Sequence, residues 1–200
     1  ECDYGRFDTD GKFHPNSPYS IYKTGTYFGI YASISMDGNS IVYGPYQNRL
    51  WVFRYNHETK QWGKFNADGT FSNNDYYQLD ASLLNSELGI SASYGSNRVA
   101  FSGDGKRILV GGNGGNGGWL FVWEFNEDTK EWGRYMADGT FATNAPHNLS
   151  KPNANMYYGD DMSITADGKT VAVSGDFNTA VGQSQGKVYI WRYDEASASW

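Results

Sequence analysis

The chain has 200 residues with a formal net charge of −6, and it is rich in aromatic residues (17%) and in glycine (25 residues). No run of Lys or Arg exceeds two residues and no apolar run approaches the roughly 18 residues of a membrane span, so a basic groove for nucleic acid and a membrane-spanning helix are both excluded. Aromatic side chains suit half-buried pleated surfaces and glycine suits turns, so this composition predicts an all-β fold.

Three sequence elements recur in a fixed order along the chain. The first is an aromatic residue followed by Gly, with an Asp-Gly pair six residues after the aromatic, and it begins at Tyr4, Trp62 and Trp132, with Trp200 opening a fourth copy. The second is an Asp-Gly pair at 37–38, 104–105 and 167–168, and the third is an apolar run at 50–55, 120–125 and 188–193. Three elements that keep one order indicate an internal repeat.

Each repeat predicts four short strands. The first strands are expected over 31–35, 98–102 and 162–165, the second over 40–43, 107–110 and 170–173, and the third over the apolar runs given above. The Asp-Gly pair between the first two strands is typical of a tight hairpin, because Gly adopts the positive φ that the turn needs. An Asx-type turn, beginning at Asn56 in the first repeat, then leads to a fourth strand that starts at Trp62, Trp132 or Trp200.

The third strand is apolar on both faces, with Trp51 and Phe53 on one face and Val52 on the other. A sheet of this kind must be covered on both sides, and radial stacking of sheets covers it. We therefore expect a β-propeller of four-stranded antiparallel blades, about three of them in one domain over 1–200. The repeat units are placed at 14–71, 72–141 and 142–200, with 1–13 as the outer strand of a preceding or closing blade. A β-sandwich is the alternative, but it does not explain so regular a repeat.

Closed propellers have about four to eight blades, and this chain supplies three. One interpretation is that the chain is part of a larger propeller. The other is that two or more copies close a ring, in which the strand near Tyr4–Phe7 completes the last blade. We expect the first, because stopping at Trp200 removes a strand that the repeat requires.

Two glycine-containing columns resemble the FG-GAP type of propeller repeat, which occurs in integrin α-subunit head domains. The first column matches Phe28-Gly29 and Tyr158-Gly159, with Tyr94-Gly95 one residue out of register; the second falls on Gly44-Pro45, Gly111-Gly112 and Ser174-Gly175. The resemblance covers nearly the whole chain and implies a propeller of a cell-surface or extracellular protein. Calcium-binding members have an Asp-rich loop between the columns, whereas this chain has only a tight Asp-Gly turn, so we expect no metal site. Repeats of the WD40 type fit less well, because their period is about 40 residues.

The connections between repeats are rich in Asn, Ser and Tyr and are where function is expected. Tyrosines beside amides and carboxylates would stack on a sugar ring and bond its hydroxyls; the alternative is that these tyrosines pack between blades. The candidate ligand-binding residues are Asn74, Tyr76, Tyr77, Tyr157, Tyr158 and Asp160. A short helix over 80–89, capped by Asp80, is expected in the second connection.

The three histidines, His14, His57 and His147, are predicted to lie in loops, and no catalytic or metal-binding pattern accompanies them. We therefore expect no catalytic residue, no cofactor and no enzyme activity. Asn148 begins an N-glycosylation triplet in a predicted loop, which favours an extracellular or cell-surface location.

The leading hypothesis is a non-catalytic interaction module of a cell-surface, extracellular or assembly protein that contacts another protein. One alternative is lectin-like glycan binding through the inter-blade loops, and another is a structural subunit of a filament or capsid surface. The expected partners are a protein and, in the lectin-like alternative, a glycan, with no nucleic acid. Further blades or a homo-oligomer would close the propeller.

Overall fold

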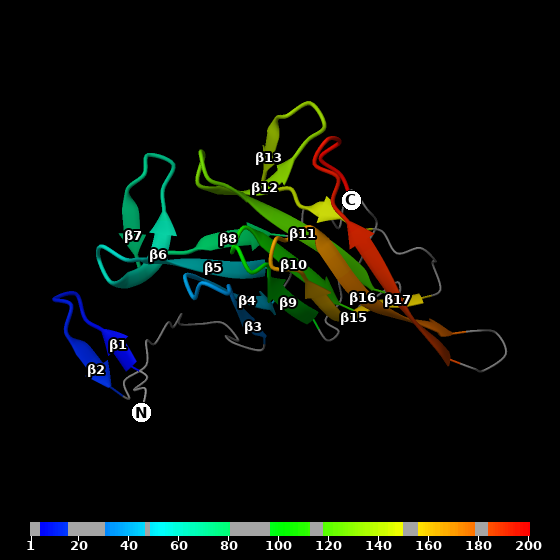
Figure 1. The fold of residues 1–200 in the computed structure, drawn as a ribbon, viewed down its shortest axis with the longest axis horizontal. Helices are drawn as coiled ribbons and strands as arrows, with labels where there is room; N and C mark the ends of the chain where they lie inside the picture. Colours follow the sequence, from blue (N-terminus) through cyan, green and yellow to red (C-terminus); the bar gives the residue numbers. More distant parts are fainter. Residues whose placement is uncertain are drawn as a thin grey trace.

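The computed structural model describes residues 5–15, 31–46, 49–80, 97–112, 118–149, 156–178 and 184–200, and the regular structure among them is entirely β-strand. The strands form three large antiparallel sheets, which we call blades 1, 2 and 3, and one separate hairpin (Figure 1). No helix within these ranges is long and apolar enough to cross a membrane.

The four sheets follow one another along the chain. The separate hairpin consists of β1 (Gly5–Phe7) and β2 (Phe13–Pro15). Blade 1 contains β3 (Ala32–Ile34), β4 (Ser40–Tyr46), β5 (Arg49–Asn56), β6 (Gln61–Phe65), β7 (Phe71–Asn73) and β8 (Tyr77–Asp80). Blade 2 contains β9 (Asn97–Phe101), β10 (Arg107–Gly112), β11 (Trp119–Asn126), β12 (Glu131–Tyr135), β13 (Phe141–Thr143) and β14 (His147–Asn148). Blade 3 contains β15 (Met156–Ile164), β16 (Thr170–Asn178) and β17 (Ser184–Arg192).

The first three predicted strands of every repeat are confirmed, as are the turns between them. Gly38 has a φ of 73°, and the carboxylate of Asp37 accepts hydrogen bonds from the Ser35 hydroxyl and the Asn39 backbone N–H. After the third strand, Asn56 Oδ1 accepts the backbone N–H of Glu58 and of Thr59, as an Asx turn requires.

The fourth strand of blades 1 and 2 differs from the prediction because it is split. β6 pairs with the C-terminal half of β5, β8 pairs with its N-terminal half, and the hairpin β6–β7 leaves the sheet between them. The sheet of blade 1 thus continues past Phe71, where the sequence places the end of the first repeat. Asp80, expected to cap a helix, ends β8 instead, and residues 81–89 of that helix lie outside the described ranges.

The blades pack face to face through the two apolar sides of their third strands. Leu50 and Val52 of β5 share a cluster with Phe121 and Trp123 of β11. On the other side of β11, Val122 shares a cluster with residues of blade 3. This stacking of antiparallel sheets is the packing of propeller blades, so the predicted fold class is confirmed.

The Asp-Gly turns of successive blades are linked in a row by main-chain hydrogen bonds. The N–H of Met36 in blade 1 donates to the carbonyl of Gly103 in blade 2 (3.2 Å), and the N–H of Asp104 donates to the carbonyl of Ala166 in blade 3 (2.9 Å). These contacts join the three blades along the edge that carries the Asp-Gly turns, which we call the blade rim.

Candidate functional site

The residues proposed from the sequence as ligand-binding belong to two different blades. Tyr158 of blade 3 is fully buried, and its hydroxyl accepts a hydrogen bond from the indole N–H of Trp191 (2.7 Å). Tyr157 and Asp160 lie on the same strand, β15. In blade 1, Asn74 lies in the turn after β7 with a φ of 57°.

The two adjacent tyrosines of blade 1 take part in packing. The ring of Tyr76 lies 5.8 Å from that of Phe53. The hydroxyl of Tyr77 bonds both the N–H and the carbonyl of Phe65, and its ring meets Phe125 of blade 2 edge-on. These contacts agree with the packing alternative for the tyrosines whose side chains are described.

Two of the three histidines are not in loops, contrary to the prediction. His14 lies in β2, where it bonds Asp8 (2.8 Å), and His147 lies in β14 and is buried. Asn148, the proposed glycosylation site, also belongs to β14, where it pairs with Phe121. The short strand was missed because two residues paired to the middle of β11 leave no alternating pattern in the sequence.

One cleft lies at the blade rim on each side of the turn that follows β11. The first cleft has a volume of about 250 Å³ and lies between blades 1 and 2. Its lining residues are Asp37, Asn39, Arg54, Tyr55, His57, Phe65, Phe125, Glu127 and Lys130. The second cleft, of about 270 Å³, lies between blades 2 and 3 and shares Phe125 and Glu127 with the first.

Arg54 occupies the first cleft because of the alternation along β5. It lies on the same strand face as Leu50 and Val52, the face that packs on blade 2, but at the rim end of the strand. Its guanidinium lies over the ring of Phe125, 4.2 Å from the centroid. Arg54 Nη1 is buried and has no hydrogen-bond partner among the described residues.

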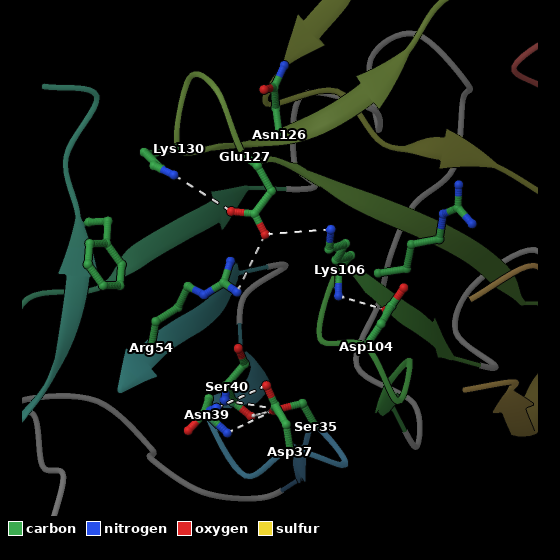
Figure 2. Close-up of polar contacts among 12 residues, drawn as sticks. Ser35, Asp37, Asn39, Ser40, Arg54, Asp104, Lys106, Asn126, Glu127 and Lys130 are labelled. Atoms are coloured by element: carbon green, nitrogen blue, oxygen red, sulfur yellow. Dashed lines mark hydrogen bonds and ion pairs between the residues drawn. The ribbon is translucent and has the colours of Figure 1, made fainter. Parts of the chain in front are cut away.

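Three cations surround the carboxylate of Glu127, each at a longer distance than a direct hydrogen bond (Figure 2). Lys130 Nζ lies at 3.7 Å, Lys106 Nζ at 3.9 Å and Arg54 Nη2 at 4.0 Å from its oxygens. Charge-assisted N–H···O bonds are typically about 2.7–2.9 Å long. Glu127 therefore compensates the three charges only loosely, in keeping with its 47% side-chain exposure.

The opposite side of the first cleft is formed by the Asp-Gly turn of blade 1 (Figure 2). Partial burial acts to raise the pKa of Asp37, but hydrogen bonds from Ser35 and Asn39 and the charge of Arg54 outweigh it and lower the pKa. Asp37 is thus an anion held by its own turn. The cleft thus contains this anion, the guanidinium of Arg54 with no direct hydrogen bond to a carboxylate, and the aromatic rings of Tyr55, Phe65 and Phe125.

The second cleft contains an arginine whose donors are satisfied. Arg107 bonds the buried carboxylate of Glu124 through Nε (2.7 Å) and Nη2 (2.5 Å), and its Nη1 donates to the Gly168 carbonyl (3.2 Å). Glu124 also interacts with His147 Nε2 (3.0 Å) and accepts the Tyr135 N–H (3.1 Å). Burial acts to raise the pKa of Glu124, but His147, Arg107 and the Tyr135 N–H together lower it.

Sequence reasoning missed both arginine sites, although one signal was present. The repeat alignment places a charged residue at the same rim position of each third strand: Arg54, Glu124 and Arg192. A charge that recurs in an otherwise apolar strand indicates a polar rim. The partner of Glu124 is Arg107 and that of Arg54 is Glu127, and both partners come from other strands or turns. These contacts therefore do not follow from the spacing of the repeat.

The chain matches no family model and no curated protein. Among solved structures it is similar to a GH43 endo-arabinanase from Bacillus licheniformis, with 11% identity and a TM-score of 0.48, over 94% of this chain and 62% of that one. It is also similar to TolB from Acinetobacter baumannii, with 11% identity and a TM-score of 0.41, over 92% of this chain and 35% of that one. The chain thus spans less than two thirds of either protein.

These comparisons correct one prediction. The interpretation of the chain as a non-catalytic interaction module, with its alternatives, is contradicted, because the first of the similar structures is an enzyme. Neither similarity assigns an activity to this chain. The absence of enzyme activity, the extracellular location and glycosylation at Asn148 stay predictions.

Proposed function

We propose that the first cleft binds a small organic carboxylate, with Arg54 as its principal anchor. The observation that carries the proposal is the guanidinium of Arg54, which lines the cleft and whose Nη2 lies 4.0 Å from the carboxylate of Glu127, too far for a direct hydrogen bond. A guanidinium pairs with a carboxylate through two parallel N–H···O bonds. The Nη2 group of Arg54, which faces Glu127, is the donor offered to such a ligand.

The surroundings of Arg54 support a carboxylate in particular. The carboxylate of Glu127 already lies between Arg54, Lys106 and Lys130, at a distance from all three. A ligand carboxylate that approaches Arg54 more closely would displace Glu127 toward solvent. The rings of Tyr55 and Phe125 would then cover the apolar part of the ligand.

A titration with glucuronate and glucose tests the proposal, because the two sugars share a ring and differ in a carboxylate. Isothermal titration calorimetry should detect glucuronate and not glucose. Arg54→Gln should weaken glucuronate binding by at least about tenfold, since a hydrogen bond to a charged group contributes about 1.5–3 kcal/mol.

Two further variants make the test specific. Glu127→Gln should strengthen glucuronate binding, because it removes the competing carboxylate. Lys12→Gln changes the net charge as Arg54→Gln does, but in the exposed hairpin β1–β2, and should leave binding unchanged. Equal binding of glucose, or equal losses in Arg54→Gln and Lys12→Gln, would show that the cleft does not recognise a carboxylate.

We also propose that the repeats are of the FG-GAP type. Tyr158-Gly159 matches the first column, and Gly159 has a φ of 96° with its missing Cβ directed at the backbone N of Gly112, a residue of the second column in blade 2. The two columns would then be the points where neighbouring blades approach most closely. Gly159→Ala should lower the urea midpoint more than Gly186→Ala, where a Cβ meets no atom within 4 Å; equal shifts would speak against this assignment.

A further inference from the structure

One side of blade 3 exposes the apolar residues that the other two blades bury. Leu50 and Val52 of β5, and their counterparts Leu120 and Val122 of β11, are at most 2% exposed because the next blade covers them. The counterparts in β17 are Val188 and Ile190, which are 69% and 66% exposed. The face of blade 3 that carries Val188 and Ile190 is therefore not covered by any described residues.

The edge of blade 3 is also unpaired where the other blades have an outer strand. β5 pairs with β6 and β8, and β11 pairs with β12 and β14. Among the described strands, β17 pairs only with β16. The rings of Tyr193 and Trp200 lie 5.4 Å apart, much as those of Tyr55 and Trp62 do in blade 1 (5.3 Å), so blade 3 repeats the start of the same outer arrangement.

The separate N-terminal hairpin has the structure of the outer element that no described strand supplies to blade 3. Gly5 pairs with Pro15 in β1–β2, as Gly63 pairs with Asn73 and Gly133 with Thr143 in the blades. The ring pair Phe7–Phe13 (5.1 Å) corresponds to Phe65–Phe71 (4.8 Å) and Tyr135–Phe141 (5.0 Å). Phe7 is 47% exposed, and the hairpin forms a sheet of its own.

The pairing partners of these glycines define where the hairpin fits. Gly63 lies opposite Arg54 in blade 1, and Gly133 lies opposite Glu124 in blade 2. The residue of β17 at that position is Arg192. The sequence similarity also extends beyond the hairpin, because Tyr19 and Ile21 stand 58 residues before Tyr77 and Leu79, the same offset as Gly5 from Gly63.

We infer that the hairpin β1–β2 of one copy adds to the β17 edge of a second copy, with Gly5 opposite Arg192. The hairpin and β17 lie at opposite ends of the molecule, so the hairpin that reaches this edge comes from another copy (Figure 1). Main-chain hydrogen bonds along the added strand supply affinity. Blade 1 of that copy, which follows the hairpin along its chain, would then lie against Ile190 and Val188, as blade 2 lies against Leu50 and Val52, and add apolar burial. The partner of this surface is thus a second copy of the chain.

Sedimentation equilibrium over a range of concentrations tests the inference on the full chain. The chain should self-associate, and Ile190→Asp should weaken the association by at least about tenfold, which corresponds to about 1.4 kcal/mol. Met136→Asp is the control, because Met136 is also an exposed apolar residue (37% exposed) but lies in the turn between β12 and β13 of blade 2. It should leave the association unchanged.

A synthetic peptide of residues 1–22 identifies the segment that docks. The peptide should compete with the hairpin, dissociate the oligomer and slow hydrogen exchange of the β17 amides. A monomeric chain, equal effects of the Ile190 and Met136 variants, or an oligomer that resists the peptide would each overturn the inference. Glucuronate binding at Arg54 lies at another interface and is measured separately, so the two proposals fail independently.

Discussion

At both blade interfaces an arginine stacks on an aromatic ring, but the charge of the arginine is neutralised differently. At the interface of blades 1 and 2, Arg54 lies 4.2 Å from the ring of Phe125 and 4.0 Å from the nearest carboxylate. At the interface of blades 2 and 3, Arg107 lies 4.1 Å from the ring of Tyr193 and bonds Glu124 directly. The first interface therefore retains an arginine with no direct hydrogen bond to a carboxylate, whereas in the second the arginine and Glu124 form an ionic network closed by direct bonds.

A shift of the arginine by one strand produces this difference. Arg54 belongs to the third strand of blade 1 and lies opposite Ser40 of the second strand. In blade 2 the arginine has moved to the second strand, as Arg107, and its cross-strand neighbour on the third strand is Glu124. A guanidinium reaches the same aromatic position from either strand, but only the second arrangement brings a carboxylate beside it.

The largest predicted effect comes from removing the carboxylate of the closed network. Glu124→Gln leaves Arg107 and His147 buried without their anion, so the free energy of unfolding should fall by about 3–5 kcal/mol. Urea denaturation at neutral pH measures it. Glu127→Gln is the control, because that exposed carboxylate makes only long ion pairs and should change the free energy by less than about 1 kcal/mol. Similar losses in both variants would mean that the network is not closed.

A second test compares the two arginines directly. Arg107→Gln should destabilise the chain by about 3 kcal/mol, because it leaves the buried Glu124 charge only partly compensated. Arg54→Gln should cost about 1 kcal/mol, the size of a partly exposed cation–π contact. The difference between the two free energies of unfolding is the quantity of interest. If Arg54→Gln proves the more costly variant, the contrast between the interfaces is wrong.

The arrangement of charged residues in blade 2 can also be introduced into blade 1. Ser40→Arg combined with Arg54→Glu places the arginine on the second strand of blade 1 and a carboxylate on the third, as in blade 2. A double-mutant cycle should give a favourable coupling of about 1–2 kcal/mol between the two changes, a size usual for residues in contact. The double variant should also lose glucuronate binding. A coupling near zero would show that strand position alone does not create the ion pair.

The sequence predicted the features that repeat, and it missed those that occur in only one blade or depend on pairing. Three strands per blade and the turn at Gly38 follow from alternation and the Asp-Gly pair. The split outer strand does not, because β14 has two residues and its register comes from β11. The partner of Arg107 is equally hidden, since Glu124 is 17 residues away and replaces an arginine at the equivalent position of blade 1.

Acid should remove the stabilisation of the fold that the charge of Glu124 provides. The pKa of Glu124 is below its ordinary value of 4.5 in the folded chain, because the bonds from His147, the charge of Arg107 and the Tyr135 N–H outweigh the burial that acts to raise it. A lowered folded-state pKa stabilises the fold above the unfolded-state pKa, and the contribution is lost as pH falls through the folded-state pKa. The difference in unfolding free energy between the wild-type chain and Glu124→Gln should therefore be full at pH 7 and shrink below about pH 4.5. Asp37 also has a lowered pKa, but both chains contain it, so its contribution cancels in this difference. A difference that stays constant down to pH 3 would place the stabilisation in packing and not in the charge of Glu124.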